Sequence, residues 1–223
     1  MGCNKMELNS LDELYEKAVK EIKDQKGVIT INIGGIPKTS NSNDIIGNCV
    51  QEWIPQWLED NGLKLTKNEN SQKFPDFTAQ IKGMNYDMEV KCWNYNNDPA
   101  FDIANFDGFY REIFTYPEKL WANYLIFGYT PNKHGFQIDN IYLKNIWEIT
   151  SASRKYPIGL QVKQKRPYAI RPFPFHKTPE KSFKNIAEFI EAIYKTRKLF
   201  TLEEMIDPDE WKEKVMNGIH NHK

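Results

Sequence analysis

Hydrophobic and polar residues alternate along two neighbouring stretches near the middle of the chain, residues 77–81 and 86–92. A period of two residues is typical of strands that bury one face and leave the other polar. Gly83 lies between the two stretches, where a tight turn is needed. The pattern therefore predicts an antiparallel hairpin with one apolar and one polar face.

The register of this hairpin is restricted because its apolar faces must lie together. A turn at residues 83–84 offsets Asp76 from Glu89, whereas a turn at residues 82–83 places the two acids directly opposite each other. In both registers Asp76, Glu89 and Lys91 share the polar face, with Cβ atoms roughly 5–8 Å apart.

Other periodicities predict helices and strands around the hairpin. Apolar residues at helical spacing, with polar caps, indicate helices over residues 10–25, 44–61 and 182–198 and a short one after Pro208. Strands are expected at residues 28–33 and 124–129, residues 34–43 are expected to form a loop, and the prolines of 167–174 argue against a regular central strand. We expect an α/β (α+β) fold, in which a central mixed sheet containing the hairpin is flanked by helices.

Length and composition limit the class of protein. The chain has 223 residues, a length that predicts one domain, 1–223. Of these residues 40% are hydrophobic and 27% are charged, a composition that excludes a disordered chain. Within this domain we expect a core at about 44–130 and C-terminal helices over 182–219. No apolar run is long enough to span a membrane, and three distant cysteines favour the cytoplasm.

Charge is unevenly distributed, although 30 Lys and Arg balance 30 Asp and Glu. Residues 149–179 contain no acid but several bases: Arg154, Lys155, Lys163, Lys165, Arg166, Arg171 and Lys177. Such a segment can neutralise DNA phosphates and release their counterions. We therefore predict that residues 149–179 bind DNA; the alternative is an exposed edge strand protected by lysines.

Particular side chains of this segment are candidates for DNA contacts. If residues 161–165 form a strand, Gln161, Lys163 and Lys165 share a face that could line a groove, while Arg166 faces the other way. Tyr168 and Arg171 follow closely and complete the predicted set.

The polar face of the hairpin suggests metal-assisted chemistry. Asp76 and Glu89 can share Mg²⁺ through carboxylate oxygens, and the Val90 carbonyl is a plausible further ligand. Lys91 could orient or deprotonate an attacking water, or neutralise charge that develops on a phosphate. Glu52, on the helix predicted over 44–61, could add a third carboxylate; the alternative is an exposed Glu at the edge of that helix.

The pattern Pro75-Asp76 … Glu89-Val90-Lys91 resembles the PD-(D/E)xK nuclease superfamily. Residues 100–107, 124–129, 160–163 and 168–172 are similar to type II restriction endonucleases, in particular to the NgoBV-like group. The resemblance covers most of residues 44–175.

This resemblance implies a restriction-endonuclease-like fold and a homodimer that cuts double-stranded DNA at a short symmetric site with Mg²⁺, giving 5′-phosphate ends. It implies that Asp76 and Glu89 bind the metal, that Lys91 is the catalytic lysine, and that Glu52 is the helix acid by position. A cognate DNA methyltransferase would be the expected genetic partner.

Two other functions are compatible with the residues. One is a DNA repair or junction-resolving nuclease of the same superfamily. The other is a DNA-binding protein without catalysis, although the intact Asp76, Glu89 and Lys91 argue against it.

Overall fold

The computed structural model describes residues 8–68, 74–200 and 206–220, and these form two compact units. The first comprises the described residues of 1–98 and 123–144, and the second those of 99–122 and 145–223. That the whole chain acts as a single domain stays a prediction.

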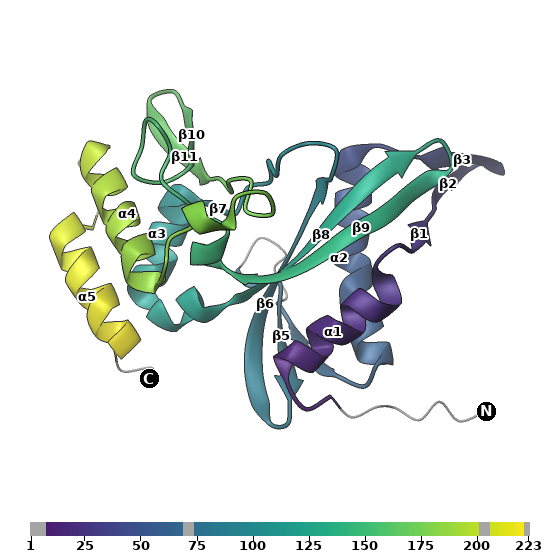
Figure 1. The fold of residues 1–223 in the computed structure, drawn as a ribbon, viewed down its shortest axis with the longest axis horizontal. Coiled ribbons are helices and arrows are strands. Elements are labelled where there is room, and N and C mark those ends of the chain that lie inside the picture. The colour runs from purple at the N-terminus through teal and green to yellow at the C-terminus, as the bar shows by residue number, and fades with distance from the viewer. Residues whose placement is uncertain (1–7, 69–73, 201–205, 221–223) are drawn as a thin grey trace. The chain divides into compact units, whose positions relative to one another are not determined.

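A six-stranded mixed sheet forms the centre of the first unit, with strand order β1-β9-β8-β6-β5-β4 (Figure 1). Its strands are β1 (Lys26–Gly27), β4 (Lys64–Lys67), β5 (Phe77–Ile81), β6 (Met84–Asn94), β8 (Asn123–Asn132) and β9 (Gly135–Asn145). β5 and β6 pair antiparallel, whereas β6 and β8 pair parallel. The mixed sheet flanked by helices confirms the predicted fold class.

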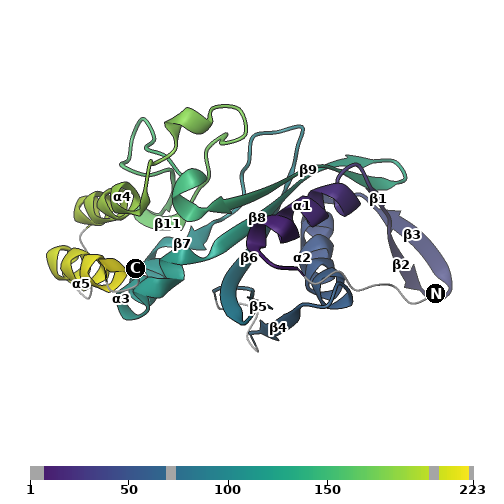
Figure 2. The ribbon, with the colours of Figure 1, turned by 60° about the horizontal axis from the view of Figure 1, so that its bottom comes forward.

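Two helices lie against one face of this sheet, α1 (Leu11–Ile22) and α2 (Asn43–Asp60) (Figures 1 and 2). Ser10 caps α1 by accepting a hydrogen bond from the Glu13 N–H, as the sequence indicates. The apolar stripes of both helices and the apolar faces of β5, β6, β8 and β9 form one core. Alternation along each strand then directs the remaining side chains to the opposite face of the sheet.

The β5–β6 hairpin turns at Lys82 and Gly83, both of which have positive φ, 50° and 80°. Thr78 pairs with Asp87 and Phe77 with Met88. Of the two registers that the sequence allowed, the structure therefore adopts the one that places Asp76 opposite Glu89. Two consecutive residues with positive φ match the right-handed twist of the flanking strands.

A second hairpin corrects the loop expected at residues 34–43. β2 (Ile29–Ile33) and β3 (Ile36–Ser40) pair antiparallel around Gly34 and Gly35, whose φ values of 57° and 82° suit a two-residue turn. Ile33 and Ile36, on either side of the turn, are exposed. The apolar residues beyond the two glycines were too few to reveal a strand by alternation.

The second unit contains a three-stranded sheet with order β10-β11-β7. Its elements are β7 (Ala104–Asn105), α3 (Phe106–Thr115), β10 (Leu160–Lys163), β11 (Arg166–Ile170), α4 (Ile186–Leu199), α5 (Pro208–His220) and the short 3₁₀ turns Pro117–Trp121, Ile146–Glu148 and Pro179–Lys181. Contrary to expectation, β11 is a central strand despite Pro167. Proline is tolerated because β7 pairs only with Ala169 and Ile170.

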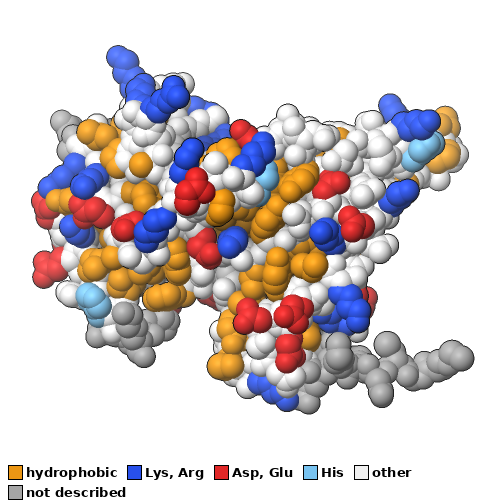
Figure 3. Space-filling model, in the orientation of Figure 1, with side chains coloured by type: hydrophobic (Ala, Val, Ile, Leu, Met, Phe, Trp, Pro, Cys, Tyr) orange, Lys and Arg blue, Asp and Glu red, His pale blue; other side chains and the backbone are white. Residues whose placement is uncertain are grey.

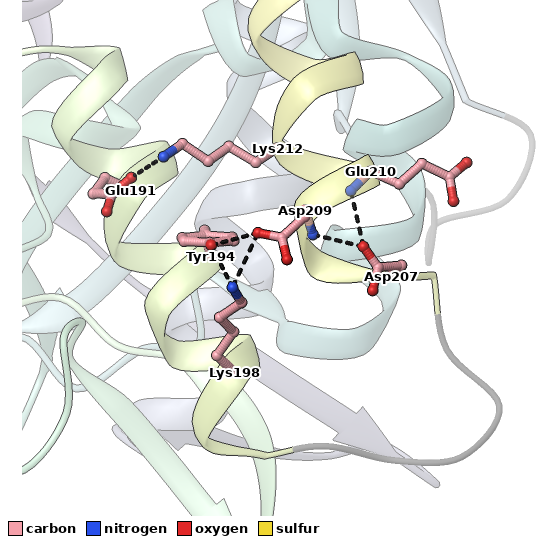
Figure 4. Close-up of polar contacts among 7 residues, drawn as sticks. All are labelled: Glu191, Tyr194, Lys198, Asp207, Asp209, Glu210 and Lys212. Atoms are coloured by element: carbon pink, nitrogen blue, oxygen red, sulfur yellow. Dashed lines mark hydrogen bonds and ion pairs between the residues drawn. The ribbon is translucent and has the colours of Figure 1, made fainter.

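Helices α3, α4 and α5 pack through aromatic and charged side chains. The rings of Tyr110 and Trp211 stack at 4.5 Å, and the Trp211 indole donates to the Tyr110 carbonyl at 2.7 Å. At the surface, Asp209 of α5 accepts hydrogen bonds from Tyr194 and Lys198 of α4 (Figure 4). In the described ranges, no helix combines the length and apolar character that crossing a bilayer requires.

Candidate active site

Asp76 and Glu89 face each other at the open end of the β5–β6 hairpin. The Asp76 N–H donates to Glu89 Oε2 at 3.2 Å, and the Val90 N–H donates to Asp76 Oδ2 at 2.7 Å. Glu89 is only 6% exposed. The backbone thus fixes both carboxylates, as the hairpin register requires.

Lys91, two residues beyond Glu89 on the same face, completes the group that the sequence predicted. Its Nζ lies 2.8 Å from Glu89 Oε1, and both side chains are largely buried. Burial alone would lower the pKa of Lys91, but the charge and hydrogen bond of Glu89, with the charge of Asp76, raise it above its ordinary value. Lys91 is therefore an ammonium ion at neutral pH.

The two carboxyl groups hold protons more tightly than usual. Burial, reinforced by the neighbouring charge of Asp76 and opposed by Lys91, raises the pKa of Glu89 to about 6. Burial also raises the pKa of Asp76, against the lowering effects of the Val90 N–H and Lys91. Carboxylates that are costly to ionise together gain most from a nearby cation.

The oxygen atoms of the hairpin are of the kind that binds divalent cations. In the part of the chain that the structure describes, no group of three or more His, Cys, Asp or Glu side chains comes together. The hairpin itself offers the carboxylates of Asp76 and Glu89 and the carbonyl of Val90 as oxygen donors. An all-oxygen set suits a hard ion such as Mg²⁺.

Helix α2 contributes Gln51 to this region, and not the predicted Glu52. The Gln51 amide donates to the Val90 carbonyl at 2.6 Å, leaving that oxygen a second lone pair. Glu52 is exposed and lies on α2, which covers the apolar face of the sheet. The side chains of Glu89 and Lys91 project from the opposite face. The structure therefore does not bring Glu52 to the two acids.

Sequence reasoning also missed Tyr124, which lies in an apolar stretch of β8. The parallel pairing of β6 and β8 places Tyr124 beside Glu89. Burial, with smaller contributions from the charges of Glu89 and Asp76, raises the pKa of Tyr124 well above its ordinary value. Glu89 and Tyr124 are far apart in sequence, so only the register between β6 and β8 reveals that they are neighbours.

The predicted DNA-binding residues lie on the β10–β11 hairpin and just after it, in the second unit. Lys163, Lys165, Arg166 and Tyr168 are exposed, and basic side chains gather at the end of the hairpin (Figure 3). Lys165 lies in the turn, not in a strand, because Gln164 and Lys165 have positive φ of 49° and 61°.

The expected division of these side chains between two faces is wrong. The register shifts between Gln161 and Val162 because Tyr168 of β11 has no partner on β10. Lys163 pairs with Arg166, and its Nζ lies 3.5 Å from the centre of the Tyr168 ring. Lys163, Arg166 and Tyr168 therefore lie together on an exposed face, which contradicts the expected opposite direction of Arg166.

Arg171 and Gln161 are bonded to each other within the second unit. Arg171 donates to Gln161 Oε1 at 2.9 Å and lies 3.0 Å from Asp102 Oδ1. It also donates to the Ala100 carbonyl. These contacts give both residues a positioning role in this unit, and their contact with DNA stays a prediction.

A central mixed sheet whose hairpin groups Asp76, Glu89 and Lys91 is the arrangement expected of a PD-(D/E)xK restriction endonuclease. Comparison with known proteins defines the family. The sequence model of the NgoBV restriction endonuclease family matches residues 8–223, and the chain belongs to this family.

Individual relatives agree with this assignment. The chain is 32% identical to the type II restriction enzyme NlaIV of Neisseria lactamica over 191 residues, covering 82% of this chain and 79% of the relative. It is 30% identical to the type II restriction enzyme NgoBV of Neisseria gonorrhoeae over 156 residues, covering 68% and 89% respectively. A solved structure of the NlaIV restriction endonuclease aligns with a TM-score of 0.84 and 28% identity, over 99% of this chain and 92% of that one.

Proposed function

We propose that this protein is a type II restriction endonuclease that hydrolyses phosphodiester bonds of double-stranded DNA at a short specific site, with Mg²⁺. The grouping of Asp76, Glu89 and Lys91 on one hairpin is the observation that carries the proposal, since the family relation alone leaves the site residues open. The proposed protein is cytoplasmic. It would act as a homodimer, because a symmetric DNA site is read most simply by a two-fold assembly. A cognate methyltransferase would protect the host DNA.

Each residue has a distinct role in this proposal. Asp76, Glu89 and the Val90 carbonyl would hold the cation, and Gln51 fixes that carbonyl. A cation held there would polarise the scissile phosphate and would offset the charge that develops on it. Lys91, held by Glu89 and protonated at neutral pH, supports that charge and orients the attacking water.

The products follow from in-line attack on phosphorus. The water oxygen forms a bond to phosphorus and gives up a proton to solvent as the bond from phosphorus to O3′ breaks, and the departing O3′ takes up a proton from solvent. The fragments then carry a 5′-phosphate and a 3′-hydroxyl. DNA contacts are proposed for six side chains of the second unit: Gln161, Lys163, Lys165, Arg166, Tyr168 and Arg171.

Sequencing of the fragment ends tests this function. Phage DNA is incubated with the protein and Mg²⁺, and then with EDTA in place of Mg²⁺. Fragments that share one end sequence and form only with Mg²⁺ support a restriction enzyme. Cutting only at mismatches or branched junctions would favour a repair nuclease, and binding without cutting would favour a non-catalytic protein.

A further inference from the structure

The hydroxyl of Tyr124 is a polar group buried without a hydrogen bond. Tyr124 is 1% exposed, and among the described residues no atom pairs with its hydroxyl. Burial of an unpaired hydroxyl costs free energy, and most buried polar groups in native proteins are paired. Its position therefore requires an explanation.

Tyr124 shares the polar face of the sheet with the candidate active site. In the parallel register its neighbour on β6 is Glu89, which in turn faces Asp76. The next residue, Leu125, belongs to the core on the other face, as strand alternation demands. The ring of Phe74 lies 6.2 Å from the Tyr124 ring on this side.

The nearby carboxylates already have other donors. Glu89 accepts from Lys91 and from the Asp76 N–H, and Asp76 accepts from the Val90 N–H. The Tyr124 hydroxyl bonds to neither acid. It is thus a neutral donor beside two anions, and a phosphodiester entering this site brings acceptor oxygens.

We propose that Tyr124 is a further catalytic residue, whose hydroxyl donates a hydrogen bond to a non-bridging oxygen of the scissile phosphate. This inference rests on the proposed function and names a contact that it does not require. A donor aimed at an oxygen whose charge grows during attack stabilises the transition state more than the ground state. Because the hydroxyl is buried in the DNA-free protein, DNA binding must uncover it before this contact can form.

Tyr124→Phe removes only the hydroxyl, and Tyr110→Phe is the matched control. The Tyr110 hydroxyl is also buried without a partner among the described residues, but it lies in the second unit on α3. Neither change removes a hydrogen bond within the protein, so both variants should melt at or above the wild-type temperature. Single-turnover cleavage should fall about a hundredfold in Tyr124→Phe and stay unchanged in Tyr110→Phe.

A DNA substitution identifies the oxygen. Stereopure methylphosphonates at the scissile position replace one non-bridging oxygen, and binding is measured in Ca²⁺. For one diastereomer, the wild type should lose affinity, whereas Tyr124→Phe should lose less because the contact is already absent. Equal losses in both proteins would overturn the inference.

Two further outcomes would also overturn it. Cleavage by Tyr124→Phe at the wild-type rate would show that the hydroxyl contacts nothing in the reaction. A lower melting temperature would show that the hydroxyl has a partner inside the protein. If the wild type itself does not cut DNA, the proposed function fails instead, so the two failures are distinguishable.

Discussion

Glu89 makes the stability of the metal-free protein depend on pH. Burial raises its pKa from the ordinary 4.5 to about 6. Below pH 4.5 the Glu89 carboxyl is protonated in both the folded and the unfolded protein. Between pH 4.5 and 6 it ionises in the unfolded chain but stays largely protonated in the folded protein. The free energy of unfolding should therefore fall as pH rises through this window, by about 2 kcal/mol.

Urea unfolding in EDTA at pH 4.5 and pH 7 measures this effect. Because other groups also titrate, the informative quantity is the difference between the wild type and Glu89→Gln. The decline should be smaller in the variant. An equal decline in both proteins would mean that Glu89 ionises normally in the fold.

Lys91 should contribute to cleavage far more than to DNA binding. Lys91→Ala removes a buried ammonium that supports developing charge, and single-turnover cleavage should fall by roughly 10²–10⁴. Affinity for the specific site in Ca²⁺ should change little. Lys67→Ala, which removes an exposed lysine from β4, is the control. If binding and cleavage fell by the same factor, Lys91 would be a phosphate contact only.

At the scale of elements, an ion pair with a buried arginine joins α3 and α4. The Arg197 side chain is 1% exposed, pairs with Asp107, and has its guanidinium 4.7 Å from the centres of the Phe106 and Tyr110 rings. Asp107→Ala leaves that charge buried without its carboxylate and should cost about 3–5 kcal/mol.

Chemical denaturation compares this variant with Asp209→Ala. Asp209 pairs with Lys198 at the surface between α4 and α5 (Figure 4), so its removal should hardly change stability. If Asp107→Ala and Asp209→Ala lost similar amounts of unfolding free energy, the buried ion pair would stabilise the protein no more than the exposed one.

The β10–β11 hairpin should bind DNA through Lys163 and Arg166, which share its exposed face. If Arg166 contacts a phosphate, Arg166→Ala weakens all DNA alike and lowers the salt slope by about one. If Lys163 or the neighbouring Lys165 reads a base, its Ala variant costs roughly 1–3 kcal/mol at the specific site only.

Binding of each variant to specific and unrelated duplexes separates these roles. Unchanged affinity in all three would place the DNA contacts elsewhere. Lys184→Ala, an exposed lysine just before α4, serves as the control.

The elements differ in how far sequence could predict them. Strict alternation and Gly83 restricted the β5–β6 hairpin to two registers, and only the geometry of the Lys82-Gly83 turn decides between them. The β2–β3 hairpin escaped because its glycines resembled a loop. The bulge at Tyr168 of β11 was not predicted, because one unpaired residue shifts the register between two strands without leaving a mark in the composition.

At the scale of the whole molecule, the sequence predicted which residues form the candidate site better than it predicted their neighbours. Asp76, Glu89 and Lys91 lie on adjacent strands, so local periodicity brings them together. Gln51 and Tyr124 reach the same hairpin from α2 and β8, through packing and a parallel register that no local pattern records. The match to the restriction endonuclease family, in contrast, is not confined to these site residues, because it covers residues 8–223.

The two carboxylates of the hairpin are the groups on which the proposed cleavage depends most directly. Asp76→Asn keeps an oxygen for the Val90 N–H but removes the charge that would hold a cation. Asp87→Asn is the matched control, since Asp87 lies on the same face of β6 and accepts a hydrogen bond from Thr78 instead.

The decisive measurement is the single-turnover rate at one mapped site in Mg²⁺, with all DNA bound. Asp76→Asn and Glu89→Gln should show no cleavage above background while remaining folded, and Asp87→Asn should cut at nearly the wild-type rate. Near-normal cleavage by both Asp76→Asn and Glu89→Gln would contradict the assignment of this hairpin as the active site.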